Sequence, residues 1–302
     1  MPNAETVLAS GLSAVGDWVK TCRPKHWLKN SFVVVPAAFS EHYGDVSVWI
    51  EAFFAFACFC PLSSAMYLLN DVVDRKADAS HPRKRLRPVA AGRILPIAAI
   101  VGAISLMAIA VGLAAILLPV EFLAAMGAYT GNTLLYIFLL KNRVIVDVML
   151  IAIGFVIRLL AGSIAVEIEP SSWLLLCGFS LALVLGFGKR RAEVETEGVN
   201  SEYRSTLMSY SRGKLDTLLG VTTATCLLSY MLYTVAAETI ALHGTNKLTY
   251  TVPLVAYGLF RYLFKSQEGR KDGPTDLIIA DPVFPLTGLL WIASVIAVFL
   301  WK

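Results

Sequence analysis

Charged residues are scarce in this chain of 302 residues. Asp, Glu, Lys and Arg make up 16% of the sequence, hydrophobic residues make up 57%, and the mean hydropathy is +0.66. Soluble domains are about one quarter charged, so this composition favours lipid over water as the solvent of the folded chain. No polar stretch is long enough for a soluble domain. We therefore expect a single polytopic membrane domain over residues 1–302.

Cysteine and histidine are also few, and their positions exclude two further classes of protein. The five cysteines are odd in number, and Cys58, Cys60, Cys177 and Cys226 lie in apolar stretches, so they do not form a disulfide framework. The four histidines are scattered without zinc-type spacing. The first 20 residues lack the charged start, apolar centre and small-residue cleavage site of a signal peptide.

Apolar runs long enough to cross a bilayer, about 20 residues each, recur along the whole chain. They predict an all-α integral membrane protein with nine transmembrane helices. The first run is shorter than the others. The nine predicted spans are residues 28–42, 47–69, 94–117, 120–140, 144–166, 171–189, 215–239, 248–266 and 283–301.

The lysines and arginines determine the predicted orientation. With nine spans and a cytoplasmic N-terminus, all of the 26 cations except Arg158, Lys247 and Lys302 fall on the cytoplasmic side. The cytoplasmic loops are then about 70–93, 141–143, 189–214 and 266–282. These cations form a layer at the inner membrane face, beside anionic headgroups and phosphorylated substrates. The net charge of +4 is therefore not a signal for nucleic acid, and we expect membrane lipids as partners.

One cytoplasmic segment, "YLLNDVVDRKADASHPRKRLRPVAAGRI" (67–94), concentrates acids and then cations. If the second span continues as a helix, Asp71, Asp74 and Asp78 lie on one face at i, i+3 and i+7. The spacing is compatible with a solvated helix end. It is more typical of a site for a hard divalent cation, above all Mg²⁺, which prefers a few carboxylates together with phosphate oxygens. Asn70 offers a further side-chain oxygen. We thus predict metal ligands at Asn70, Asp71, Asp74 and Asp78.

The cations that follow are Arg83, Lys84, Arg85 and Arg87. For Arg83 and Lys84, a purely topogenic role is equally compatible with the pattern. Arginine forks fit phosphate oxygens, however, and a basic loop beside a metal site is suited to a multiply charged substrate. We predict Arg83, Arg85 and Arg87 as substrate ligands.

The motif "NDVVDRKADASHPRKRLRPVAAGRI", the nine-span layout and "YIFLLK" (136–141) resemble the UbiA superfamily of membrane prenyltransferases. This resemblance implies a helical bundle around a central cavity that opens to lipid and to the cytoplasmic face. Most members of the superfamily transfer a prenyl group from a Mg²⁺-bound prenyl diphosphate. Aromatic prenyl transfer, as in quinone synthesis, is therefore one candidate function.

A second segment departs from that majority. Typical members carry another aspartate-rich motif after the sixth span, whereas this chain reads "GFGKRRAEVETEG". Lys189, Arg190 and Arg191 there precede Glu193, and the three cations indicate direct binding of phosphate. "RPKHWLKN", "FVIRLLAGSIA" and "GKRRAE" are similar to the branch formed by polyprenyl-phosphate phosphoribosyltransferases.

That branch implies 5-phosphoribosyl 1-diphosphate as the donor and a polyprenyl phosphate such as decaprenyl phosphate as the acceptor, supplying arabinose donors for a cell envelope. Asp71, Asp74 and Asp78 would be catalytic, holding the leaving diphosphate with Mg²⁺. The KRR cations would take the ribose 5-phosphate or the lipid phosphate. A transporter or scaffold is the third candidate, although polar groups confined to one face argue against a transport path.

Four further residues complete the predicted substrate site. Asp147 and Arg158 share a face of one helix, ~16 Å apart along its axis. Asp147 either orients Lys141 or binds the ribose hydroxyls, and Arg158 either lines the cavity or pairs with a neighbouring helix. Lys29, in "RPKHWLKN", is the better phosphate ligand of a segment that equally suits an interface anchor around Trp27.

The expected location is the bacterial inner membrane, with the active site facing the cytoplasm. A homo-oligomer is compatible with this architecture.

Overall fold

The computed structural model describes residues 4–197, 210–268 and 273–301. Every regular element among these residues is a helix, which confirms the all-α prediction. The chain divides into two compact units. Unit 1 consists of Met1–Ala37, Asp45–Lys141 and Leu160–Glu167, and unit 2 consists of Ala38–Gly44, Asn142–Leu159 and Ile168–Lys302.

The first part of the chain folds into helices of very different length. These are α1 (Ala4–Cys22), the 3₁₀ helix η1 (Pro24–Val33), α2 (Val35–Ala38), α3 (Val46–Val73), α4 (Arg75–Ser80), the 3₁₀ turn η2 (Lys84–Leu86), α5 (Pro96–Leu117), α6 (Val120–Leu135) and the π-helical turn η3 (Tyr136–Leu140).

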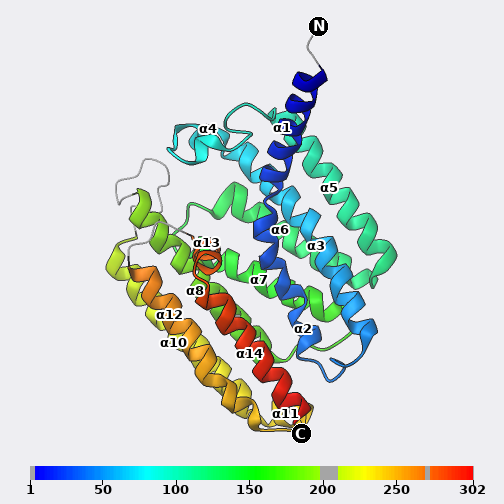
Figure 1. Ribbon diagram of the computed structural model, residues 1–302, viewed down its shortest axis with the longest axis vertical. Coiled ribbons are helices and arrows are strands. Elements are labelled where there is room, and N and C mark those ends of the chain that lie inside the picture. The colour runs from blue at the N-terminus through cyan, green and yellow to red at the C-terminus, as the bar shows by residue number, and fades with distance from the viewer. Residues whose placement is uncertain (1–3, 198–209, 269–272, 302) are drawn as a thin grey trace. The chain divides into compact units, whose positions relative to one another are not determined.

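Helices α3 and α5 lie side by side in unit 1 (Figure 1). The face of α5 that is buried carries alanines, with Ala99, Ala103 and Ala110 each at most 1% exposed. Such small residues allow two helix backbones to approach closely in a membrane protein. On α3 the buried Phe59 ring meets Phe122 and Tyr129 of α6 edge to face.

The predicted first span, 28–42, is not a single α-helix. Arg23 has a left-handed backbone (φ 53°), and Pro24 follows it, so α1 ends and the chain continues as η1 and the short α2. Side chains fasten η1 to α3. The fully buried Asn30 amide donates to Ser63 Oγ (3.1 Å), and the Trp27 indole donates to Ser64 Oγ (3.0 Å).

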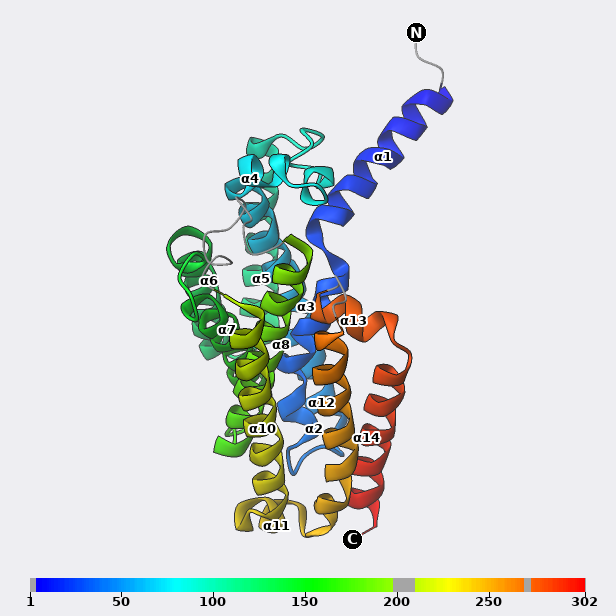
Figure 2. The ribbon, with the colours of Figure 1, turned by 90° about the vertical axis from the view of Figure 1, so that its left-hand side faces the viewer.

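The remaining helices are α7 (Val146–Ala165), α8 (Ser172–Glu197), α10 (Arg212–Val235), α11 (Ala237–His243), the 3₁₀ helix η4 (Lys247–Thr251), α12 (Val252–Gln267), α13 (Pro274–Ala280) and α14 (Val283–Leu300). Figure 2 shows α10 running beside α12, and α10 also packs along α8. Where α8 meets α12, Gly188 leaves room for the Tyr262 hydroxyl, which would lie 1.9 Å from an added Cβ.

Seven helical segments of the described chain are long and apolar enough to cross a bilayer. They are Val46–Val73, Pro96–Leu117, Val120–Leu140, Val146–Ala165, Ser172–Glu195, Arg212–Val235 and Val283–Leu300. They match seven of the nine predicted spans. Of the other two, 28–42 is divided as described, and 248–266 corresponds to α12, which has 16 residues. The number nine stays a prediction.

Candidate functional site

The aspartates of the first motif lie where α3 gives way to α4. Asp74 caps α3 and starts α4, with φ −84° and ψ 0°. The Asp74 N–H still donates to Asn70 O (2.9 Å), and the Asp78 N–H donates to Asp74 O (2.8 Å). Helical spacing is therefore almost maintained through the junction. Asp71 and Asp78 are buried, at 2% and 4% exposure.

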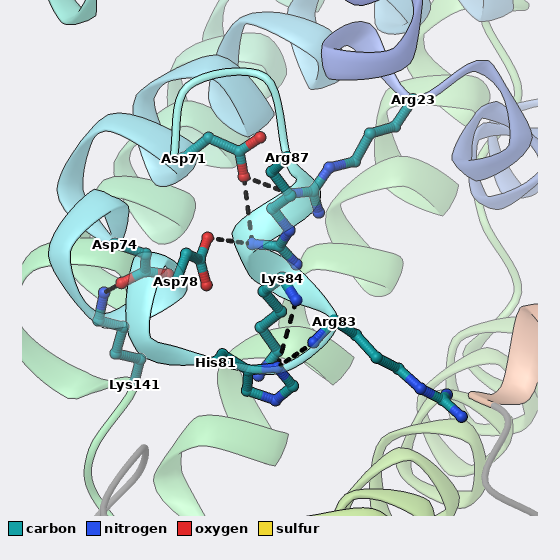
Figure 3. Close-up of polar contacts among 9 residues, drawn as sticks. All are labelled: Arg23, Asp71, Asp74, Asp78, His81, Arg83, Lys84, Arg87 and Lys141. Carbon is teal, nitrogen blue, oxygen red and sulfur yellow. Dashed lines mark hydrogen bonds and ion pairs between the residues drawn. The ribbon is translucent and has the colours of Figure 1, made fainter. Parts of the chain in front are cut away.

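Two of the aspartates converge on one guanidinium group. Arg87 Nη1 lies 2.6 Å from Asp78 Oδ2 and 3.3 Å from Asp71 Oδ1 (Figure 3). Arg23 forms an ion pair with the same Asp71 oxygen, and its guanidinium also stacks over the Tyr67 ring at 4.9 Å. Asp71 thus faces two arginines, which offset the unfavourable burial of its charge.

Asp74 is turned toward a different partner. Its carboxylate forms an ion pair with Lys141, the residue that follows the π-helical turn η3 (Figure 3). The Lys141 N–H donates to Tyr136 O (2.9 Å), the i→i−5 bond of that turn. Lys141, the first residue after η3, therefore contacts the first motif. That Asp147 orients Lys141 or binds the ribose hydroxyls stays a prediction.

These carboxylates suit a divalent cation in part. In the described part of the chain, no three acidic, histidine or cysteine side chains gather around one point, because Asp74 is drawn to Lys141. Asp71 and Asp78 do direct one oxygen each at a single positive atom, Arg87 Nη1. Mg²⁺ is commonly held by one or two carboxylates plus water and substrate phosphates. Two of the predicted ligands thus fit the ion.

The basic residues after the aspartates do not act as a block. Arg87 turns back to the carboxylates, whereas Arg83 and Arg85 are exposed, and Figure 3 shows Arg83 directed away from the aspartates. The chain bends at His81, whose ring Nδ1 accepts the N–H groups of Arg83 (3.1 Å) and Lys84 (3.2 Å). The turn η2 follows.

The N-terminal contribution to the site comes from Arg23. In this segment, which equally suits an interface anchor, Lys29 was predicted to be the better phosphate ligand. In the structure Arg23 contacts Asp71 across 48 residues of sequence, while Lys29 is half-buried within η1. No local pattern reports such a long-range pair. The role of Lys29 in phosphate binding stays a prediction.

The three cations of the second basic segment, Lys189–Arg191 on α8, differ in how deeply they are buried. Lys189 is 43% exposed and lies 4.0 Å from Glu193. Arg190 has no exposed surface, contacts Glu193, and places Nε 2.7 Å from Asp147 Oδ2. That last contact is an ion pair of opposite charges and not an aligned hydrogen bond. Direct phosphate binding by Arg190 would require release of these acids.

Arg191 belongs to a separate group of charges where α8 ends and α10 begins. It donates to Asp216 Oδ1 (2.9 Å) and Glu195 Oε2 (2.8 Å), and Arg212 donates to Glu195 Oε1 (2.8 Å). The Arg191 side chain is 6% exposed. Lys189 is therefore the member of the triplet whose side chain faces outward most.

Tyr210 connects Asp147 to the turn before α7. Its hydroxyl accepts the Ile145 N–H (2.7 Å) and donates to Asp147 Oδ1 (3.2 Å). Ile145 has φ 69°, a strained conformation for a β-branched residue that neighbouring contacts must hold. Burial raises the pKa of the Tyr210 phenol to about 12, the Ile145 N–H lowers it, and the charge of Asp147 raises it.

Arg158 lies inside α7 and is 5% exposed. Its guanidinium donates to the carbonyl of Gly154 one turn earlier (3.0 Å) and stacks near the Phe155 ring at 5.5 Å. Part of its hydrogen-bonding capacity is thus used by its own helix. Whether it lines a substrate cavity stays a prediction.

Arg23, His81 and Tyr210 were not among the residues predicted for the site. For His81 the sequence does offer a sign, because a polar side chain just before a turn can accept hydrogen bonds from the backbone N–H groups that follow. Tyr210 and Arg23 had none, since their contacts join residues 63 and 48 positions apart.

Comparison with known proteins identifies the family of this chain. The model of the UbiA prenyltransferase family matches residues 31–280. The chain belongs to the UbiA prenyltransferase family. It is accordingly a transferase and an integral membrane protein, as predicted.

Curated relatives of this UbiA family member share most of its length. The decaprenyl-phosphate phosphoribosyltransferase of Corynebacterium glutamicum is 31% identical over 286 residues, covering 92% of this chain and 85% of the relative. The enzyme of the same name from Mycobacterium tuberculosis is 31% identical over 290 residues, covering 92% of each.

Solved structures confirm the UbiA fold. A UbiA homologue from Archaeoglobus fulgidus bound to DMAPP and Mg²⁺ superposes with a TM-score of 0.70 at 19% identity, covering 94% of this chain and 99% of the other. A digeranylgeranylglyceryl phosphate synthase structure gives a TM-score of 0.61 at 14% identity, with 96% coverage of both chains.

Proposed function

We propose that this UbiA family member transfers the 5-phosphoribosyl group from 5-phosphoribosyl 1-diphosphate to a polyprenyl phosphate such as decaprenyl phosphate. The reaction releases diphosphate and depends on Mg²⁺. The names of the relatives at 31% identity support this substrate pair. The observation that supports the proposal most is that Lys189–Arg191 stands where typical family members have a second aspartate motif. Asp71 and Asp78 then form one carboxylate pair, which suits a single metal–diphosphate group.

We assign the metal to Asp71 and Asp78, whose oxygens converge, and keep Asp74 and Asn70 as the further predicted ligands. When bound, Mg²⁺ would neutralise the departing diphosphate and polarise its bond to carbon. Arg87 and Arg23 neutralise the carboxylates in the structure. On donor binding their guanidinium groups would donate to diphosphate oxygens, for which their fork geometry is suited.

The transfer itself needs no protein nucleophile. The bond between C1 of the ribose and the diphosphate oxygen breaks, and the electron pair leaves with the diphosphate. An oxygen of the lipid phosphate forms the new bond to C1. That oxygen is already anionic, so no proton has to be removed. The residues of the site therefore act by positioning and by electrostatic stabilisation.

Lys189 would contact a phosphate of one of the two substrates. Its side chain is the most exposed of the triplet, whereas Arg190 and Arg191 are engaged with acids. Asp147 would act through Arg190 and not on the ribose hydroxyls, because it has no exposed surface.

The distribution of cations supports a cytoplasmic site in a bacterial inner membrane, with nine spans and a cytoplasmic N-terminus. The product, a polyprenyl phosphate carrying 5-phosphoribose at C1, would then enter synthesis of an arabinose donor for the cell envelope.

The test uses the purified protein in detergent with Mg²⁺. One reaction holds labelled 5-phosphoribosyl 1-diphosphate and decaprenyl phosphate, and a second holds a labelled polyprenyl diphosphate and 4-hydroxybenzoate. Label should pass into the lipid phase in the first reaction, and a metal chelator added at the start should prevent this transfer. Product in the second reaction alone would overturn the proposal in favour of aromatic prenyl transfer.

A further inference from the structure

His81 occupies the bend between the acidic and the basic halves of the first motif. It is 3% exposed and ends α4, with an extended backbone (φ −85°, ψ 134°). The following Pro82 disfavours a helical conformation at His81, so the helix that carries the aspartates has to stop there. Its N–H donates to Asp78 O (3.1 Å), and its carbonyl accepts the Arg85 N–H (3.1 Å).

The imidazole ring closes the turn. Nδ1 accepts two backbone N–H groups, from Arg83 (3.1 Å) and Lys84 (3.2 Å), and Figure 3 shows both contacts. An Nδ1 that accepts hydrogen bonds carries no proton, so the ring proton is on Nε2. The arrangement is the histidine counterpart of an asparagine or aspartate that caps the backbone two and three residues later.

The turn determines which cation reaches the aspartates. After His81, the Arg87 N–H donates to Lys84 O (2.9 Å) and η2 ends, so Arg87 returns to Asp71 and Asp78. Arg83 and Arg85 remain at the surface. If Nδ1 did not hold the two N–H groups, the start of η2 would lose its cap, and the position of Arg87 would no longer be defined.

We propose that His81 is a positioning residue of the transferase: its Nδ1 folds the basic turn that holds Arg87 against Asp71 and Asp78. Its role in donor binding rests on the proposed function, whereas its role in the turn does not. His81 touches no substrate and acts through Arg87. Nothing in this role requires a change of charge on the ring.

Two substitutions test whether the turn needs an acceptor atom at the position of Nδ1 or the imidazole ring itself. In His81→Asn the side-chain oxygen stands at the same number of bonds from Cα as Nδ1, and in His81→Gln the oxygen stands one bond farther. The first measurement is amide hydrogen exchange of a peptide covering residues 83–87 in the full chain in detergent. We expect His81→Gln to raise exchange at Arg83 and Lys84 by about tenfold or more, because their N–H groups lose a buried partner. His81→Asn should keep most of the protection.

The second measurement is transfer kinetics. His81→Gln should raise the KM for the phosphoribosyl donor about tenfold with a smaller change in kcat, and His81→Asn should recover most of the difference. In an Arg87→Gln background, His81→Gln should add little, because the two residues act through one contact.

Equal exchange in wild type and His81→Gln would overturn the proposal, and so would additive effects of His81→Gln and Arg87→Gln on KM. Failure of the wild type to transfer phosphoribosyl groups would instead reject the proposed function. The exchange measurement would still decide the role of His81 in that case.

Discussion

Arg190 and Asp147 form an ion pair in which neither side chain has exposed surface, with 2.7 Å between Nε and Oδ2. A pattern of three consecutive cations suggests three equivalent phosphate ligands. The pair ties one of them to a buried acid of unit 2. Glu193 also contacts Arg190, and Tyr210 donates to Asp147. Phosphate binding by the three cations stays a prediction, and Lys189 is the one whose side chain is most exposed.

Breaking this pair should destabilise the protein more than breaking an exposed one. We expect Asp147→Ala to lower the free energy of unfolding by about 3 kcal/mol or more, since it leaves a buried guanidinium without its carboxylate. Lys189→Ala removes an exposed pair and should change it by less than about 1 kcal/mol. Thermal unfolding in detergent, followed by intrinsic fluorescence, compares the two variants. Equal melting temperatures would contradict the buried pairing.

The aspartates of the first motif should dominate turnover. In the proposed reaction Asp78→Asn removes one of the two carboxylates that would hold Mg²⁺ beside the leaving diphosphate, and it should lower kcat by about a hundredfold or more. Asp276→Asn is the matched control, because it makes the same chemical change at an exposed aspartate of α13. Initial rates of transfer at saturating substrates measure both. A fall in the two variants alike would indicate general damage and not loss of a catalytic group.

If the metal binds Asp71 and Asp78 as proposed, Arg87 competes with it for these two carboxylates, so removing the charge of Arg87 should favour the metal. We expect Arg87→Gln to bind Mn²⁺ about tenfold more tightly than wild type in the absence of donor. Electron paramagnetic resonance of free Mn²⁺ gives the affinity without any turnover. Arg83→Gln, which removes an exposed cation of the same segment that Figure 3 shows directed away from the aspartates, is the control. Weaker Mn²⁺ binding by Arg87→Gln would argue against a metal between Asp71 and Asp78.

Tyr210 should ionise late, because burial raises the pKa of its phenol to about 12. An unfolded tyrosine ionises near pH 10, so the folded state binds more protons between these two values. The contribution of Tyr210 to stability is therefore fully present below pH 10 and is lost as the pH rises toward about 12. The phenolate absorbance difference between wild type and Tyr210→Phe reports this step. A difference spectrum with a midpoint near 10 would place Tyr210 in solvent.

The sequence was sufficient for the features that depend on local pattern. Composition and apolar run length predicted a helical membrane protein. The i, i+3, i+7 spacing predicted that Asp71, Asp74 and Asp78 would share a face. The backbone continues almost helically through Asp74, and Asp71 and Asp78 converge on Arg87, whereas Asp74 pairs with Lys141.

The partners of these residues could not be predicted in the same way. The pairs Arg23–Asp71 and Lys141–Asp74 join positions 48 and 67 residues apart, where the fold brings opposite charges together. The predicted first span, 28–42, is not one α-helix, because η1 continues to Val33 as a 3₁₀ helix and α2 covers only Val35–Ala38. Apolar content alone does not distinguish these conformations.

The π-helical turn at Tyr136–Leu140 has a consequence for sequence register. A π turn holds one residue more than an α turn within nearly the same rotation, so it accommodates an extra residue without turning the residues that follow. Deleting one residue of this turn would therefore give an unbroken α-helix in which Lys141 keeps nearly its present direction toward Asp74. The same deletion within the α-helical part of α6 would instead rotate the residues that follow it by about 100°, so the ion pair tolerates a change of length at η3 that it would not tolerate elsewhere in the helix.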